Sequence, residues 1–340
     1  MCTSIVYATK DHYFGRNLDL EISYGQVVTI TPRNYPFKFR RTDPLPSHYA
    51  LIGMAAVVDN YPLYFEATNE KGLSMAGLNF PENAHYFEED SGKTNISPFE
   101  FIPWLLGKCA TIDEAKKLLA EINLVNINFS EELPLSPLHW MLADQNEALV
   151  IESTIDGLKI YNNPVGVLTN NPPFDYQLFN LNNYRHVSPT VSSNHFAKNL
   201  ELDVYSRGMG GLGLPGDLSS ASRFVKASFT KWQSVSGDSE MESVNQFFHI
   251  LTSVEQQKGL CDVGNGKFEY TIYSSCCNMD KGIYYYTTYN NHQITAVEMH
   301  KENLEGTELI TYPVVDQEQI QYLNKEKISD LILMVHHLFF

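Results

Sequence analysis

Apolar and polar positions along the chain follow two different periods, and each period predicts a different kind of element. Strands are expected where β-branched and aromatic residues cluster or alternate between turn-forming residues. These stretches are residues 2–9, 12–20, 27–30, 63–68, 73–78, 140–142, 149–152, 165–169, 268–273, 282–289 and 293–299. The first two stretches meet at Lys10-Asp11 and predict a hairpin, and the turn-like residues 69–72 join another pair.

Helices are expected where apolar residues recur every three or four positions after a start signal. Three segments begin with Ser or Thr and carry Glu three residues later, the pattern of a capping box; they are residues 97–100, 111–114 and 239–242. One apolar face follows in the last two segments: Ala115, Leu118, Leu119 and Ile122, then Val244, Phe247, Phe248 and Leu251. Strands, then helices, then strands along the chain indicate sheets that are covered by helices.

The register of the first hairpin decides which side chains lie beside Cys2. With a two-residue turn, Asp19 would lie opposite Cys2 and Arg16 would point to the other face, because side chains alternate along a strand. A turn longer by one residue would place Arg16 on the Cys2 face, and a bulge at Gly15 would let both side chains converge. The pattern leaves these registers open, but in all of them Cys2, Arg16 and Asp19 lie close together.

The composition is typical of an ordered globular protein with a negative net charge. Hydrophobic side chains make up 43% of the 340 residues and no stretch resembles a linker, so one domain over residues 2–324 is expected, followed by a tail of unassigned role at 325–340. The formal net charge of −16 argues against a general nucleic-acid binder, which needs a basic face. A small anionic substrate would have to be bound by a few local arginines.

The cysteine pattern predicts a reducing compartment. The number of cysteines is odd, five, and no pair has C-x-x-C spacing. The first residues lack the basic and apolar regions of a secretory signal, and the apolar run at 331–335 is far shorter than a membrane span of roughly 20 residues. A cytoplasmic protein without membrane insertion, metal or cofactor is expected. The glycine-rich stretch at 208–213 lacks the strand and helix of a dinucleotide site.

Cys2 is the residue with the clearest capacity for chemistry. If the initiator methionine is removed, which a small second residue permits, Cys2 carries both a thiol and a free α-amino group. The reference pKa of an α-amino group is about 7.7–8.0, so this amine can take a proton from the thiol and return it to a leaving group. A small residue at position 2 also suits methionine removal without any catalytic role, and only the rest of the chain distinguishes these interpretations.

Seven ordered segments extend the pattern that begins at Cys2. They are MCTS at 1–4, FGRNLD at 14–19, NEKGL at 69–73, AGLNFP at 76–81, LTNNP at 168–172, LPGDLSSASRF at 214–224 and IYSSCCN at 272–278. Together they resemble the choloylglycine hydrolase family, and within it the conjugated bile acid hydrolases. The resemblance implies an α+β fold, the four-layer αββα sandwich of N-terminal nucleophile (Ntn) hydrolases, in which two stacked antiparallel sheets are covered by helices.

The resemblance also implies an amide hydrolase that works through an acyl-enzyme. Cys2 would attack the amide of a glycine- or taurine-conjugated bile acid and form a thioester, which water then hydrolyses. Its α-amino group would carry the proton to the departing amine. Arg16 would stabilise the thiolate, and Asp19 would orient the amine or Arg16. No cofactor and no metal is implied.

Three further polar residues complete the implied catalytic set. Asn79 and Asn170 would each offer an amide N–H to the oxyanion of the reacting carbonyl. Asn170 is preferred over Asn171 because it follows threonine as in the family motif, and Arg223 near the start of a helix belongs to the same set. Each residue alone has an ordinary alternative, a turn asparagine or a surface ion pair, but their joint occurrence favours catalysis.

The two substrate classes of the family, bile salts and penicillin V, differ in their acyl group. A steroid is large and apolar, and a pocket for it is expected among hydrophobic residues near the nucleophile: Leu18, Leu20, Tyr24, Phe65 and Leu135. Asn79 favours bile salts, because penicillin V acylases of the family tend to have tyrosine there. A penicillin V acylase and a non-catalytic binder of amphipathic acids remain alternatives, and the resemblance implies a homotetramer.

Overall fold

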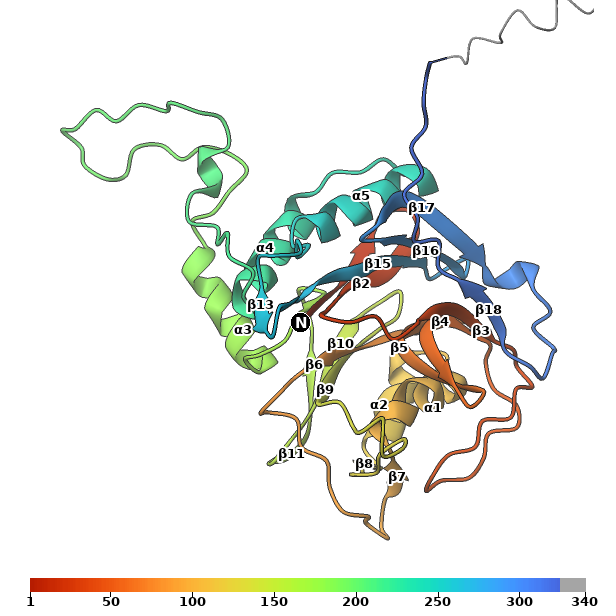
Figure 1. Cartoon of the computed structure of the whole chain (residues 1–340). Helices are drawn as coiled ribbons and strands as arrows, with labels where there is room; N and C mark the ends of the chain where they lie inside the picture. The colour runs from red at the N-terminus through yellow and green to blue at the C-terminus, as the bar shows by residue number, and fades with distance from the viewer. Residues whose placement is uncertain (325–340) are drawn as a thin grey trace, which may run out of the picture.

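Two large antiparallel sheets form the centre of the computed structural model, which describes residues 1–324 (Figure 1). The first sheet has six strands in the order β12-β1-β2-β15-β16-β17. Their bounds are β1 (Cys2–Ala8), β2 (His12–Leu20), β12 (Val167–Leu168), β15 (Tyr270–Asn278), β16 (Ile283–Thr288) and β17 (Asn291–Glu298). The N-terminal strand therefore lies inside this sheet, between β2 and β12.

The second sheet has eight strands in the order β11-β10-β9-β6-β5-β4-β3-β18. Their bounds are β3 (Val27–Thr31), β4 (Leu51–Val58), β5 (Tyr61–Asn69), β6 (Ser74–Asn79), β9 (Leu138–Ala143), β10 (Ala148–Thr154), β11 (Gly157–Asn162) and β18 (Ile310–Pro313). Alternate residues of β6 belong to different hydrophobic clusters: Ala76 and Leu78 pack against the first sheet, and Met75 packs on the opposite side. Both faces of this sheet are therefore buried.

Helices cover the outer face of each sheet (Figure 1). Helices α1 (Phe101–Lys108) and α2 (Ile112–Leu119) pack in the hydrophobic cluster on the outer side of the eight-stranded sheet. Helices α4 (Ser220–Gln233) and α5 (Glu240–Thr252) lie on β1, β2 and β15. A further helix, α3 (Phe174–Asn180), lies beside α4, where the rings of Phe174 and Phe224 are 6.1 Å apart. This arrangement confirms the expected αββα sandwich.

The predicted capping signals begin the helices. The Ser239 hydroxyl accepts from the Glu242 N–H at 3.3 Å and the Glu242 carboxylate accepts from the Ser239 N–H, which satisfies two donors at the start of α5. The signal at 97–100 starts a 3-10 turn that leads into α1. Ile122 was wrongly placed on a helical face: α2 ends at Leu119, and Ile122 begins a short strand.

Some elements were not predicted. Strand β4 is missing from the expectations because it is apolar on both faces and lacks the alternation of a half-buried strand. The edge strands β11 and β18, helix α3 and the short strands β7 (Thr94–Ile96), β8 (Ile122–Leu124), β13 (Asp262–Gly264) and β14 (Lys267–Phe268) were also missed. The predicted tail at 325–340 lies outside the described residues. Within residues 1–324, no helix is long and apolar enough to cross a membrane.

Gly15 lies where β2 and β15 approach each other closely. A Cβ atom at this position would be 2.0 Å from the carbonyl oxygen of Ser275, so only glycine fits without backbone movement. Gly15 pairs in register with Ile5, and the bulge considered there is therefore wrong. The irregularity between these two strands falls instead on β15, between Thr271 and Tyr273.

Candidate active site

The first hairpin places Cys2 and Arg16 on one face of the six-stranded sheet. Ser4 pairs with Arg16, which is the register of a turn one residue longer than the shortest alternative. Because residues two apart share a face, Cys2 and Arg16 are diagonal neighbours across β1 and β2, a separation that long side chains can bridge. Asp19 points to the opposite face, so the two-residue turn was the wrong alternative.

Arg16 is completely buried between the two sheets. Its Nη1 donates to the carbonyl oxygens of Gly77 at 2.6 Å and Phe65 at 3.1 Å, and its Nε lies 3.9 Å from Glu66 Oε2. Its Nη2 is also buried and has no hydrogen-bond partner within residues 1–324. Burial lowers the pKa of Arg16, but nearby negative groups, Cys2 first among them, outweigh burial and raise it.

Asp19 and Arg223 lie together on the face that α4 and α5 cover. Asp19 is fully buried; it accepts from Thr271 Oγ1 at 2.6 Å and from Gln256 Nε2 at 3.3 Å. The Nη1 atom of Arg223 is 3.8 Å from Asp19 Oδ2. Burial lowers the pKa of Arg223, and Asp19 and Cys2 offset this only in part. A buried arginine in this position is held as a cation by its acidic neighbour.

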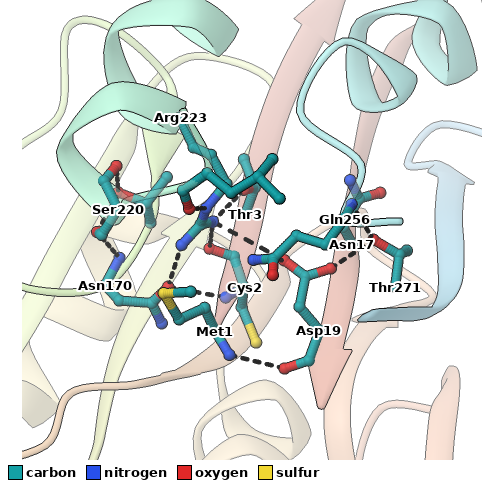
Figure 2. Close-up of polar contacts among 12 residues, drawn as sticks. Met1, Cys2, Thr3, Asn17, Asp19, Asn170, Ser220, Arg223, Gln256 and Thr271 are labelled. Carbon is teal, nitrogen blue, oxygen red and sulfur yellow. Dashed lines mark hydrogen bonds and ion pairs between the residues drawn. The ribbon is translucent and has the colours of Figure 1, made fainter. Parts of the chain in front are cut away.

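Asn170 connects Cys2 to Arg223 (Figure 2). Its Oδ1 accepts from the Cys2 backbone N–H at 2.8 Å and from Arg223 Nη2 at 2.7 Å. Arg223 Nη1 also donates to the Cys2 carbonyl at 2.5 Å and to Thr3 Oγ1 at 2.6 Å. The backbone of Asn170 is itself fixed, because its N–H donates to Ser220 Oγ at 2.8 Å. Both main-chain groups of Cys2 are therefore held by side chains.

Asn79 reaches this cluster from the end of β6 in the other sheet. Its carbonyl oxygen accepts from Asn170 Nδ2 at 2.7 Å, so the two asparagines are in contact. The side chain of Asn171 turns elsewhere: it donates to the Pro81 carbonyl at 2.8 Å and accepts from Asn83 Nδ2 at 3.1 Å. Of the two adjacent asparagines, only Asn170 contacts Cys2 in the structure.

Met1 precedes Cys2 in the full chain and carries the free amine. The N-terminal ammonium donates to the Asp19 carbonyl at 2.7 Å and to Glu269 Oε1 at 2.5 Å. Removal of Met1 would turn the Cys2 backbone nitrogen into the terminal amine. Asn170 Oδ1 already accepts a hydrogen bond from that nitrogen, so the new amine would form beside an oriented acceptor.

The predicted pocket residues are only partly brought together. Leu18 is buried in the core beside Cys2, and Leu20 and Phe65 are half-buried against the same core. Tyr24 is 48% exposed, and its ring centre lies 6.2 Å from that of Phe65. Leu135 lies in a different loop, before β9. The structure thus brings the Tyr24 ring beside that of Phe65 and pairs Leu18 with Cys2 across the first hairpin.

Several groups around the site were not predicted: Thr3, Glu66, Ser220, Gln256, Glu269 and Thr271. Ser220 lies inside the segment 214–224, so the motif carried a signal for it. Glu66 interrupts an otherwise apolar strand, and a charged residue at an inward position was the only available signal. In the part of the chain described here, no group of three His, Cys, Asp or Glu side chains could hold a metal ion.

Sequence comparison relates the whole chain to known enzymes. Residues 2–312 match the family model described as linear amide C–N hydrolases, choloylglycine hydrolase family. The chain is 62% identical to a bile salt hydrolase/transferase of Lactiplantibacillus plantarum, over 95% of this chain and 100% of that protein. It is 37% identical to a conjugated bile acid hydrolase of Lactobacillus acidophilus, over 92% of this chain and 100% of that protein.

Solved structures agree with the sequence comparison. A crystal structure of a mutant conjugated bile acid hydrolase from Clostridium perfringens matches with a TM-score of 0.88 and 38% identity, covering 95% of this chain and 100% of that one. A penicillin V acylase from Agrobacterium tumefaciens has a TM-score of 0.73 at 20% identity, covering 92% of this chain and 91% of that one. The second match is evidence for the fold alone.

Proposed function

The chain belongs to the choloylglycine hydrolase family of linear amide C–N hydrolases, and on that premise we propose that it hydrolyses glycine- and taurine-conjugated bile acids with Cys2 as the nucleophile. The 62% identity to a bile salt hydrolase/transferase over nearly the whole chain supports this substrate class. The reaction needs a mature chain that begins at Cys2, because the proposed base is the α-amino group of that residue.

In the proposed reaction, the Cys2 amine takes the thiol proton and Sγ attacks the amide carbonyl carbon. The C–N bond then breaks, the amine passes the proton to the departing glycine or taurine, and a thioester remains on Cys2. Water attacks the thioester with the Cys2 amine as base, which releases the free bile acid and restores the thiol. An amine in place of water would give acyl transfer, in keeping with the hydrolase/transferase name of the Lactiplantibacillus plantarum relative.

The polar residues around Cys2 take different roles in this proposal. The buried Nη2 of Arg16, which no described residue engages, is the donor available to the thiolate. Arg223 holds the Cys2 main chain from the helix-covered face, and Asp19 supplies the negative charge beside Arg223. Asn170 Nδ2 donates one N–H to the Asn79 carbonyl, and its second N–H is available to the oxyanion. The side-chain amide of Asn79 can also donate to the oxyanion.

The observation that carries the proposal is the shared contact at Asn170 Oδ1. One oxygen accepts from the nitrogen that becomes the Cys2 amine and from Arg223, so the amine forms already oriented and beside a positive charge. A positive neighbour disfavours protonation of an amine, which suits a base. A protein that only bound amphipathic acids would have no use for this arrangement.

Bile salts are favoured over penicillin V as the acyl donor. A penicillin V acylase of Pectobacterium atrosepticum is 30% identical, but over only 52% of this chain and 41% of that protein. Asn79 agrees with the bile salt preference that the family resemblance implied. We assign Leu18, Leu20, Tyr24 and Phe65 to the steroid pocket, with Leu135 as an outer wall.

Assembly and location form part of the same proposal. We propose a cytoplasmic homotetramer. The five cysteines are free in the structure, which suits a reducing compartment. The connection between α3 and α4 exposes large apolar side chains such as Phe196 and Tyr205, both more than 80% exposed, which suits burial in an interface. Light scattering on the eluting protein would give the mass of the assembly.

The decisive test is release of glycine and taurine by the purified protein from glycocholate and taurocholate, with penicillin V in parallel and under reducing conditions. We expect rapid release from the bile salts and little cleavage of penicillin V. The variant Cys2→Ala, with the same fold by circular dichroism, should release nothing.

The other outcomes have distinct meanings. Preferential cleavage of penicillin V would still support Cys2 as the nucleophile but would refute bile salts as the substrate. No release from any of the three compounds, by protein whose N-terminal methionine is shown to be absent, would refute the proposed hydrolase and favour a binder of amphipathic acids.

A further inference from the structure

Glu66 is a buried carboxylate at the interface of the two sheets. It lies on β5 and is 2% exposed. Three hydroxyl groups of the other sheet donate to it: Tyr273 at 2.7 Å, Ser275 at 3.0 Å and Tyr284 at 2.5 Å. Burial raises the pKa of Glu66, and Arg16 and these hydroxyls offset the rise only in part. A carboxylate with this many donors is built to carry a negative charge.

Arg16 is the cation that this carboxylate faces. Glu66 Oε2 lies 3.9 Å from Arg16 Nε, and both side chains are buried. The guanidinium is also fixed by the carbonyl oxygens of Phe65 and Gly77. These two contacts do not involve the Glu66 side chain, so loss of its charge would leave Arg16 in place. Arg16 therefore has two acidic partners, the Glu66 carboxylate and the Cys2 thiolate when it forms.

We propose that Glu66 sets the acidity of the Cys2 thiol, because its fixed charge competes with the thiolate for Arg16. The proposal rests on the function proposed above in so far as Cys2 is the nucleophile. Without Glu66, Arg16 would stabilise the thiolate more strongly and Cys2 would ionise at lower pH. A thiolate of lower pKa is a weaker nucleophile, and an attacking thiol works best when its pKa is near the ambient pH. Glu66 is thus a positioning residue that acts on Cys2 through Arg16.

The other titratable groups around Glu66 leave this competition intact. Burial, together with Glu66 itself, raises the pKa of Tyr273 and Tyr284 well above the usual value, so both remain neutral donors. Burial also raises the pKa of Cys277, on the same strand as Tyr273, to about 12, so that thiol stays neutral. Arg16 is the cation in contact with Glu66, and the charge of Glu66 affects the ionisation of Cys2 through Arg16.

The test measures the ionisation of Cys2 without any bile salt. The rate of Cys2 alkylation by iodoacetamide is followed against pH by mass spectrometry of the N-terminal peptide, in the wild type and in Glu66→Gln. For a lost charge at a distance on the order of 10 Å and an effective dielectric constant of about 20, Coulomb's law gives a midpoint lower by about one pH unit. On the rising part of the curve, that shift makes the thiolate fraction about tenfold larger, and the weaker nucleophilicity of the thiolate leaves alkylation about threefold faster.

Two further variants keep the result interpretable. Glu100→Gln changes a different buried carboxylate, one that accepts from Ser97 N–H at the start of the 3-10 turn before α1, and it should leave the midpoint unchanged. Tyr284→Phe removes one donor to Glu66 and keeps its charge group, so it should raise the Glu66 pKa and move the midpoint in the same direction by a smaller amount. This variant tests the proposal even if Glu66→Gln fails to fold.

A midpoint that stays the same or rises in both Glu66→Gln and Tyr284→Phe would overturn the proposal. A rise in Glu66→Gln would show instead that Glu66 is needed to hold Arg16 in place. Because alkylation requires no substrate, the experiment gives its answer even if the protein releases no amine from bile salts. Failure of the proposed function and failure of this inference are therefore distinguishable.

Discussion

Two buried arginines flank Cys2 from opposite faces of the same sheet. Arg16 lies between the sheets, and its Nη2 has no hydrogen-bond partner within residues 1–324. Arg223 instead donates to Asn170 Oδ1 and to the Cys2 carbonyl. Arginine retains its charge when buried, and its planar group can hold several acceptors at once. One arginine is therefore available to the reacting thiol, and the other organises the backbone that carries it.

The role of Arg223 in organising the Cys2 backbone can be tested at Asn170, which contacts both residues. Asn170→Ala removes the acceptor of Cys2 N–H and Arg223 together with one donor to the oxyanion. We expect kcat for glycocholate to fall by about 10²–10³, the usual effect of losing one oxyanion donor.

Asn171→Ala is the matched control for this prediction. Its side chain contacts the loop at Pro81 and Asn83 instead of Cys2, and a loss of less than about threefold is expected, typical of a surface contact. Equal losses in the two variants, measured by steady-state kinetics, would contradict the assigned role of Asn170.

At the scale of elements, the tight packing of β2 on β15 fixes the strand that carries Arg16. The backbone of Ser275 lies so close to Gly15 that no Cβ atom fits between them. A larger residue must push the strands apart, and strand separation would disturb every pair between β2 and β15. Only glycine at position 15 allows this close packing, which in turn fixes the strand that carries Arg16.

Gly15→Ala should reduce the stability of the protein by about 3 kcal/mol, the upper end of the usual range for overpacking a core. The measurement is the midpoint of chemical denaturation. Gly216→Ala is the control, because a Cβ atom there meets nothing within 4 Å. A midpoint for Gly15→Ala equal to that of the control would show that the strands can separate at little cost.

The elements themselves illustrate what a pattern of residues can predict. The capping box at 239–242 and the helical face of α5 were read correctly because these signals are local in sequence. At 111–114 the Thr111 hydroxyl caps α2 as predicted, but the Glu114 carboxylate accepts from the Ala110 N–H instead of the Thr111 N–H. Strand β4 was missed because burial on both faces removes the alternation that marks a strand. Ile122 was misplaced because one apolar residue fits both the end of a helix and the start of a strand.

At the scale of the whole molecule, stability should depend on pH through Lys231. This residue of α4 donates to the Val165 carbonyl at 2.7 Å, and burial lowers its pKa to about 8. The unfolded chain has a lysine pKa near 10.4, so between about pH 8 and pH 10.4 the unfolded state binds more protons. The contribution of Lys231 to stability therefore rises with pH across that window.

The comparison of wild type with Lys231→Met isolates this contribution. The difference in Tm, wild type minus variant, should become more positive from pH 7.5 to pH 9.5. The exposed Lys267, changed to Met in the same way, should give a difference that does not vary with pH. A constant difference for Lys231→Met, measured by differential scanning calorimetry, would contradict a lowered pKa.

The sequence by itself was enough to single out Cys2 as the candidate nucleophile and to determine the family and the layered class of fold. Those inferences depend on residues that are neighbours along the chain, such as Cys2 at the start of a strand, or on short motifs such as the one around Asn170. Local order is enough for them, because capping, alternation and motif spacing act over a few residues.

Only the tertiary structure decided how the pieces meet. The register of the first hairpin, which puts Arg16 on the Cys2 face, depends on a single residue of turn length. The contact of Glu66 with Arg16 joins two sheets, and the contact of Asn170 with Cys2 joins residues 168 positions apart. Such contacts follow from the packing of the sheets on each other, which no local pattern encodes.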